Sequence, residues 1–193
     1  MNKNKEYRSA DIAAAESESE EKQLIVTGYA AVLEQPTVIC EIDGVKYYEI
    51  IDKDAFIGAD LSDVPFKYNH SNDFLVLART RNKTLQLEVD NIGLKIRANL
   101  ADTTAGQDLY TLIERGDIDK MSFGFTVVKD SYDAITHTRR ILQFGKIWDV
   151  SAVDTPAYDG TSISARDYFT AQSEMEKRAE QEEQRKRLYL MTF

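Results

Sequence analysis

Three side chains in this sequence are of the types needed for acyl transfer to a serine hydroxyl. Ser122 lies in the segment Met121-Ser122-Phe123-Gly124-Phe125, His70 ends Tyr68-Asn69-His70, and Asp149 begins a segment that continues to Ala157. In such a reaction the serine attacks a carbonyl carbon, the histidine removes the hydroxyl proton, and the acid orients the histidine. The three residues therefore indicate a serine nucleophile, provided that the fold brings them together.

Strand periodicity favours one face for Ser122 and Asp149. Apolar residues alternate from Met121, a polar turn follows over residues 130–138, and a second strand returns over residues 139–153. If Asp130 pairs with Arg139, Ser122 lies opposite Ile147 and Asp149 lies diagonally on the same face. A slip of one residue would move Asp149 to the other face. That other face is expected to be core, with Met121, Phe123, Phe125, Leu142, Phe144, Trp148 and Val150.

The sequence has two histidines, and elimination favours His70 as the base. His137 lies in the predicted turn, roughly 25–30 Å along the strand from Ser122. His70 follows an apolar and aromatic strand from another part of the chain. The pattern alone also allows ordinary structural roles, with Ser122 as a strand residue, His70 as a turn residue and Asp149 paired with Lys146.

Composition limits the class of protein. The 193 residues carry a formal net charge of −9, which argues against a nucleic-acid-binding surface. The N-terminal residues lack the apolar core of a signal peptide, and no apolar run is long enough to span a bilayer, so we expect a soluble cytoplasmic protein with no membrane partner. Cys40 is the single cysteine, and its apolar surroundings predict a small buried side chain.

The elements that must position these residues are mostly strands. A helix is predicted from a cap at Asp102 or Thr103 to a stop at Gly116. Residues 12–22 are predicted to form an acidic surface loop, and residues 166–187 an exposed, charged helix. We therefore expect a β domain over residues 1–163 and a tail over residues 164–193. The predicted strands cover residues 24–33, 45–51, 66–70, 85–89 and 93–100.

Short motifs in a fixed order resemble the prohead (capsid-maturation) serine proteases of tailed bacteriophages, which are related in fold to the herpesvirus assembly proteases. The motifs cover most of residues 8–157. They are Gly28-Tyr29-Ala30-Ala31-Val32, Tyr48-Glu49-Ile50-Ile51 with Ala55-Phe56, Asn69-His70, Leu77-Ala78-Arg79-Thr80, Gly93-Leu94, Ile113-Glu114-Arg115-Gly116 leading to Met121–Phe125, and Asp149–Val153 with Pro156-Ala157.

The resemblance implies a catalytic set of His70, Ser122 and Asp149, in the family's order of His, Ser and acid. It implies a small closed β-barrel with flanking helices, no cofactor and no metal. Implied substrates are the scaffold protein, an N-terminal scaffolding segment of the major capsid protein, and the chain itself. The implied location is inside the procapsid, in the cytoplasm of the infected host. A homodimer or higher oligomer is left open.

Details of the site and two other functions stay open in the sequence. Backbone amides near Ser122 and Phe123 are possible donors to the oxyanion. Arg79 could also stabilise this negative charge, but it is better explained as a residue of a surface ion pair. The charged tail is either solvated or a removable docking element. The first alternative function is a catalytically inactive β-barrel adaptor or scaffolding protein of the virion. The second, a metallohydrolase, is disfavoured because the sequence has no His-Glu-x-x-His pattern.

Overall fold

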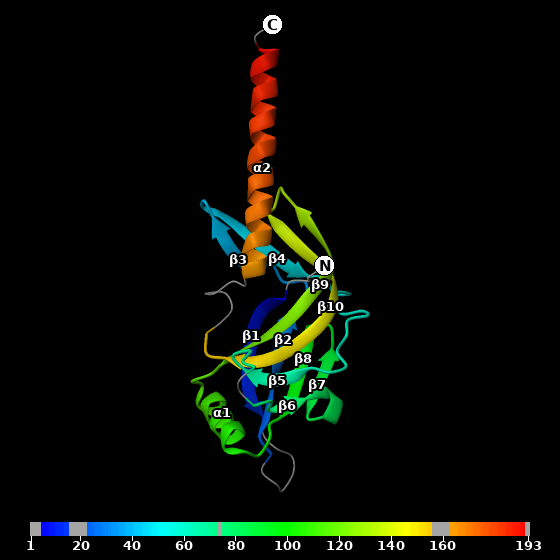
Figure 1. Cartoon of the computed structure of the whole chain (residues 1–193), viewed down its shortest axis with the longest axis vertical. Coiled ribbons are helices and arrows are strands. Elements are labelled where there is room, and N and C mark those ends of the chain that lie inside the picture. Colours follow the sequence, from blue (N-terminus) through cyan, green and yellow to red (C-terminus); the bar gives the residue numbers. More distant parts are fainter. Residues whose placement is uncertain (1–4, 16–22, 73–74, 156–162, 192–193) are drawn as a thin grey trace.

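A long antiparallel hairpin runs through the centre of the sheet in this computed structural model (Figure 1). Its strands are β9 (Lys120–Asp133) and β10 (Thr138–Val153), which meet at a polar turn. The pairing of these two strands confirms the predicted hairpin. The structure describes residues 5–15, 23–72, 75–155 and 163–191.

The described part of the chain forms eight further strands around this hairpin. The strand order is β3-β4-β10-β9-β1-β2-β8-β7, with β5 beside β10 and β6 beside β5. Both β4 and β5 run parallel to β10, at its two ends. The strand bounds are β1 Glu6–Ala15, β2 Ile25–Val32, β3 Thr37–Ile42, β4 Val45–Ile51, β5 Pro65–Tyr68, β6 Ala78–Arg79, β7 Leu85–Val89 and β8 Gly93–Asn99.

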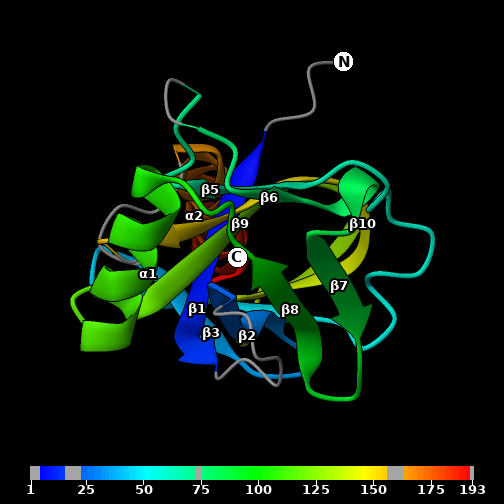
Figure 2. The same ribbon diagram turned by 90° about the horizontal axis from the view of Figure 1, so that it is seen from below.

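The mainly β class is confirmed, but the closed barrel is not. Among the described strands, β3 and β7 end the pairing order and do not pair with each other. The sheet curves instead, so that strands from both halves face a shared apolar core (Figure 2). Strand twist supplies this curvature without requiring the two edges to meet.

The register of the central hairpin differs from the predicted one. Arg139 pairs with Tyr132, and Ser122 pairs with Ser151 rather than with Ile147. Half of this four-residue difference is already present beside the turn, where Arg139 pairs with Tyr132, and register shifts between Ile141 and Asp149 supply the other half. These bulges also turn Trp148, expected in the core, outward to 43% exposure.

The N-terminal strand β1 was not predicted from the sequence pattern. Residues 12–15 belong to β1 and pair with β2 from Ile25 to Gly28, so the predicted acidic loop does not begin at Ile12. Ile12 is buried, which explains its place in the sheet. The rest of the predicted loop, residues 16–22, lies outside the described residues.

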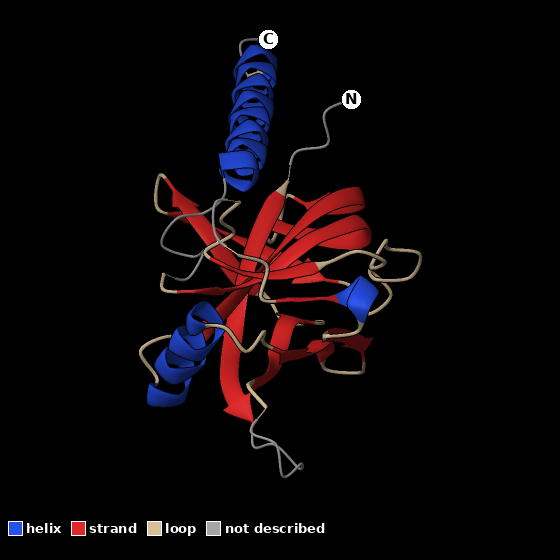
Figure 3. Cartoon of the chain, turned by 60° about the horizontal axis from the view of Figure 1, so that its bottom comes forward, coloured by secondary structure: helices blue, strands red, loops and turns tan. Residues whose placement is uncertain are grey.

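Within the residues that the structure describes, two α-helices flank the strands (Figure 3). Helix α1 (Thr104–Arg115) begins at Thr103, whose side chain accepts a hydrogen bond from the Gly106 amide, and it ends at Gly116 with a φ of 79°. Both predicted ends are therefore confirmed. A short 3-10 turn, η1 (Thr80–Asn82), joins β6 to β7.

Helix α2 (Ile163–Leu190) projects away from the strands (Figure 1). Its exposed, charged character is confirmed only for the distal part. The first turns instead bury Ala165, Phe169 and Ser173. Phe169 packs against Tyr47 of β4 in a second apolar cluster that is separate from the main core. The start of the predicted tail is therefore anchored to the sheet. None of the helices in the described part of the chain is both long and apolar enough to cross a membrane.

Candidate functional site

A tight turn at the end of β5 carries His70. Asn69 and His70 have φ values of 49° and 54°, and the Ser71 amide donates to the Tyr68 carbonyl across them at 3.0 Å. Two successive left-handed residues joined by this bond form a turn of type I′ geometry. The Asp154 amide donates to the Asn69 side chain at 3.2 Å, which ties the turn to the end of β10. His70 is therefore held in a backbone region that costs free energy for a side chain of its size, a pattern typical of functional sites.

The imidazole of His70 lies over the outer part of β10. Its Nδ1 contacts Oδ1 of Asp149. Because a carboxylate accepts only, Nδ1 carries the proton and Nε2 is left as the acceptor. Ser151 supports the same ring: its Oγ lies 3.2 Å from Nδ1 and accepts from the His70 amide at 3.2 Å. The structure thus brings His70 and Asp149 together in the orientation that a histidine base needs.

Ser122 lies beside this pair, in the neighbouring strand. It stands directly opposite Ser151, and Asp149 stands opposite Gly124, so Ser122 and Asp149 share a face. Cβ atoms of directly opposed residues lie about 4.5–5.5 Å apart. Ser122 is therefore the direct cross-strand neighbour of the residue that contacts the His70 ring. Ser122 and Asp149 share a face as expected, although the predicted register was wrong. The register error is an even number of residues, and an even shift leaves each side chain on its original face.

Two polar atoms at this site have no hydrogen-bond partner. They are Nε2 of His70 and Oγ of Ser122, and both are buried; within the described residues no other buried side-chain nitrogen or oxygen is left unpaired. Ser122 is only 1% exposed. Unpaired buried polar groups are costly and rare in native proteins. Nε2 of His70 can accept a hydrogen bond and Oγ of Ser122 can donate one, so the two unpaired atoms are complementary.

Two further residues of the site, Lys5 and Tyr7, were not predicted from the sequence. Lys5 Nζ contacts Oδ2 of Asp149, and the Tyr7 ring lies 4.2 Å from the His70 ring, centroid to centroid, at an interplanar angle of 55°. Lys5 also lies over the Tyr7 ring, with Nζ 4.8 Å from its centroid. Tyr7 is paired with Gly124, which brings β1 beside the Asp149 position. Residues 5–11 show no apolar alternation, so the sequence carried no signal that would have placed Lys5 and Tyr7 at the site.

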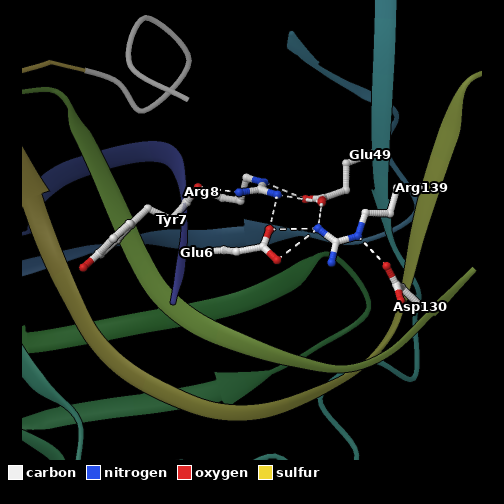
Figure 4. A network of polar contacts seen from close by, with 6 residues as sticks. All are labelled: Glu6, Tyr7, Arg8, Glu49, Asp130 and Arg139. Atoms are coloured by element: carbon white, nitrogen blue, oxygen red, sulfur yellow. Dashed lines mark hydrogen bonds and ion pairs between the residues drawn. The ribbon is translucent and has the colours of Figure 1, made fainter. Parts of the chain in front are cut away.

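The N-terminal part of β1 is fixed by a buried ionic network (Figure 4). Arg8 donates to both carboxylate oxygens of Glu49, each at 2.6 Å, and to Glu6 at 2.9 Å. Arg139 donates to Glu6 at 2.8 Å and to Asp130 at 2.6 Å. Burial alone would lower the pKa of Arg139, but the surrounding carboxylates raise it, so the guanidinium stays charged.

This network and the catalytic candidates lie on opposite sides of β1. Side chains alternate along a strand, so Glu6 and Arg8 point to one side while Tyr7 points to the other. Figure 4 shows Tyr7 turned away from the ionic groups. The buried charges thereby hold in place the strand that supplies Lys5 and Tyr7.

Asp149 is ionised despite its burial. Burial by itself raises the pKa of a carboxyl group, but the hydrogen bond of His70 and the charge of its protonated form, followed by the hydrogen bond and charge of Lys5, lower the pKa of Asp149 below its usual value. Its side chain is 1% exposed, so these two partners replace the solvent that an exposed carboxylate would have. The site is therefore equipped to stabilise a positive charge on the imidazole.

Other residues singled out in the sequence lie outside this cluster. His137 is in contact with Glu176 of α2 at 3.2 Å. Arg79 forms two hydrogen bonds with Asp63, so the expected ion pair is confirmed. Cys40 is buried, as expected, and burial raises the pKa of its thiol.

The predicted oxyanion donors do not fit the observed sheet. Strand β9 is paired with β1 and with β10 at both Ser122 and Phe123. The backbone amides of a strand paired on both sides are directed to its neighbours. We therefore do not assign the oxyanion donors to these two residues.

One hollow of the surface does not coincide with the cluster. Its volume is about 890 Å³, and Arg8, Glu49 and Phe123 are among the residues that line it. None of His70, Ser122 and Asp149 is among its lining residues. No group of three or more His, Cys, Asp or Glu side chains in the described ranges is arranged to hold a metal ion.

Comparison with protein-family models identifies the relationship of this chain. Residues 9–179 match the family described as caudovirus prohead serine protease. The chain belongs to this prohead serine protease family. The resemblance drawn from the sequence motifs is thereby confirmed. Searches of curated proteins and of solved structures found no match.

Membership of the prohead serine protease family supports a serine peptidase with a role in capsid maturation. The matched segment includes His70, Ser122 and Asp149, together with the first turns of α2. It begins at Ser9, so Lys5 and Tyr7 precede it. The distal part of α2 follows it.

Proposed function

We propose that Ser122 is the nucleophile of a serine endopeptidase, with His70 as its base and Asp149 as the acid that orients His70. The observation that supports this most strongly is the complementary pair of unpaired buried atoms, Ser122 Oγ and His70 Nε2. A hydrogen bond from Oγ to Nε2 would satisfy both, and it is the path along which the proton would move when Oγ attacks a substrate carbonyl. The contact between Nδ1 and Asp149 supplies the matching tautomer.

In the proposed reaction, Nε2 of His70 takes the proton from Ser122 Oγ as this oxygen attacks the scissile carbonyl carbon. Asp149 stabilises the imidazolium that forms. The imidazolium then gives the proton to the leaving amine, and the acyl group stays on Ser122. A water molecule, deprotonated by His70, releases the acyl group in the second half of the reaction. Because Ser122 is almost fully buried, side chains that cover it must move before a substrate can bind.

The experiment compares wild-type protein with Ser122→Ala and with Ser9→Ala, each incubated with the cognate major capsid protein and followed by intact mass. Ser9 pairs with Ser122 in β1 and is also buried, which makes it a matched control. We expect Ser122→Ala to abolish cleavage and Ser9→Ala to retain it. Cleavage by Ser122→Ala at the wild-type rate would rule out Ser122 as the nucleophile. Absence of cleavage by all three proteins would favour a non-catalytic adaptor.

The proposed substrates are the scaffold protein, the N-terminal scaffolding segment of the major capsid protein, and the protease chain itself. Family membership supports capsid protein as a substrate and a location within the procapsid in the host cytoplasm. Removal of internal segments by hydrolysis is irreversible, which suits a step that commits the particle to maturation. The same mass measurement maps the cleavage sites in each protein.

We further propose that the distal part of α2 recruits the protease into the procapsid. Residues 177–191 are exposed, and the family match ends at residue 179. The first turns of α2 pack on the sheet, so a truncation must spare them. Removal of residues 180–193 should reduce incorporation into procapsids and leave cleavage of the free capsid protein intact. Equal incorporation of both chains would contradict a recruiting role.

A further inference from the structure

The second carboxylate oxygen of Asp149 is held by a residue far away in the sequence. His70 contacts Oδ1, whereas Lys5 contacts Oδ2 from the start of the N-terminal strand, 144 positions away. The Asp149 side chain is 1% exposed, and that of Lys5 is 31% exposed. Lys5 thus reaches from the partly exposed edge of the site to the buried carboxylate of Asp149.

Gly124 makes the room that Lys5 occupies. A Cβ atom at this position would lie 2.4 Å from Lys5 Cε and 2.9 Å from Tyr7 Cε1. Gly124 stands between Tyr7 and Asp149 in the sheet. The absence of a side chain there allows Lys5 to cross β9 and reach the carboxylate.

The charge balance explains why a cation is needed. His70 must be neutral to accept a proton, and in that state it offers Asp149 a hydrogen bond but no positive charge. A buried carboxylate without a counter-charge would draw a proton onto the His70–Asp149 pair. From this geometry we propose that Lys5 is a positioning residue that keeps Asp149 ionised while His70 is neutral. The proposal rests on the catalytic roles given above to His70 and Asp149.

Two charged or titratable groups of the described chain contact this carboxylate, and a third, Tyr7, packs on the His70 ring. Lys5 comes from the segment before β1, Tyr7 from β1, and His70 from the turn after β5. The neighbouring strands β9 and β10 contribute Ser122, Gly124 and Ser151, which are uncharged. Lys5 is therefore the group whose removal changes the charge beside the pair without removing a member of it.

The first test is the pH profile of kcat/KM for the full-length protein. The substrate is a fluorogenic peptide that spans a cleavage site mapped on the capsid protein. Loss of the Lys5 charge favours proton binding by the His70–Asp149 pair, so Lys5→Gln should move the acid limb upward by about one pH unit. Lys5→Arg keeps the charge and should leave the limb near its wild-type position. An unmoved limb in Lys5→Gln would overturn the proposal.

The second test needs no turnover. In Ser122→Ala protein, the titration of the His70–Asp149 pair is followed by NMR of the imidazole carbons. The second histidine is removed by His137→Gln to leave one signal. Adding Lys5→Gln should raise the titration midpoint by about one pH unit. Gly124→Ala should move it in the same direction, because the new Cβ displaces Lys5. A midpoint unchanged by both substitutions would overturn the role of Lys5. If the midpoint moves but Ser122→Ala still cleaves, the role of Lys5 stands and the assignment of Ser122 fails.

Discussion

Arg139 and Arg140 are adjacent on β10, and each binds two or more carboxylates in different surroundings. Arg139 is buried and contacts Glu6, Glu49 and Asp130. Arg140 is 34% exposed and contacts Glu34 and Asp52. The pair therefore offers a direct comparison of buried and exposed ionic contacts within one strand.

Replacing Arg139 by Met should destabilise the fold far more than replacing Arg140 by Met. The buried network contains two guanidinium groups and three carboxylates, so its charge changes from −1 to −2 when Arg139 is lost. Loss of one partner from a buried ion pair costs about 3–5 kcal/mol. An exposed pair contributes about 0–1 kcal/mol. For a chain of this size, 1 kcal/mol corresponds to roughly 2–4 °C in Tm. We therefore expect Arg139→Met to lower the Tm by roughly 6–20 °C and Arg140→Met to lower it by less than about 4 °C.

The assay is urea unfolding at 25 °C, supported by thermal unfolding followed by circular dichroism. Addition of Glu6→Gln to Arg139→Met should recover part of the loss, because Glu6 is then no longer an excess buried carboxylate. A coupling of more than about 1 kcal/mol between these two sites is expected from their direct contact. If Arg139→Met and Arg140→Met destabilise the protein equally, the buried network does not anchor β1 as argued here.

Two other predictions concern acid stability and α2. The pKa of Asp149 is lowered in the fold, so its ionised form stabilises the protein above the unfolded value of about 3.9, and this contribution is lost as the pH falls through the folded pKa. The difference in Tm between wild type and Asp149→Asn should therefore be largest near neutral pH and shrink below about pH 4; a difference that grows on acidification contradicts this sign. Phe169→Ala should cost about 3–5 kcal/mol because Phe169 is fully buried against the sheet, whereas Leu190→Ala, at 75% exposure, should stay within about 0.5 kcal/mol. Urea unfolding measures both, and equal small losses would mean that the start of α2 is not part of the folded domain.

The hairpin and its shared polar face could be predicted because strand alternation tolerates register errors of two or four residues. Ser122 and Asp149 keep the same face under any even shift. The bulges between Ile141 and Asp149 could not be predicted from alternation. They place buried side chains at intervals of three, as at Phe144, Ile147 and Val150, and this spacing matches neither a regular strand nor a helix.

The N-terminal strand could not be recognised for a different reason. Its core-facing positions include Glu6 and Arg8, whose burial depends on partners more than 40 residues away. A sequence pattern based on apolar residues treats such a segment as solvated. Lys5 and Tyr7 were missed with it, because a site residue can be predicted only when its element is.

The same strand therefore couples stability to chemistry. Glu6 and Arg8 attach β1 to the interior through charges, and the intervening Tyr7, with Lys5, faces the proposed catalytic pair. These contacts span most of the chain, since Lys5 meets Asp149 and Glu6 meets Arg139 only after β10 is in place. A weakened ionic network should then release Lys5 from Asp149 before the rest of the sheet unfolds. The pH profile of a partly destabilised variant such as Arg139→Met should consequently resemble that of Lys5→Gln at temperatures where most of the protein is still folded.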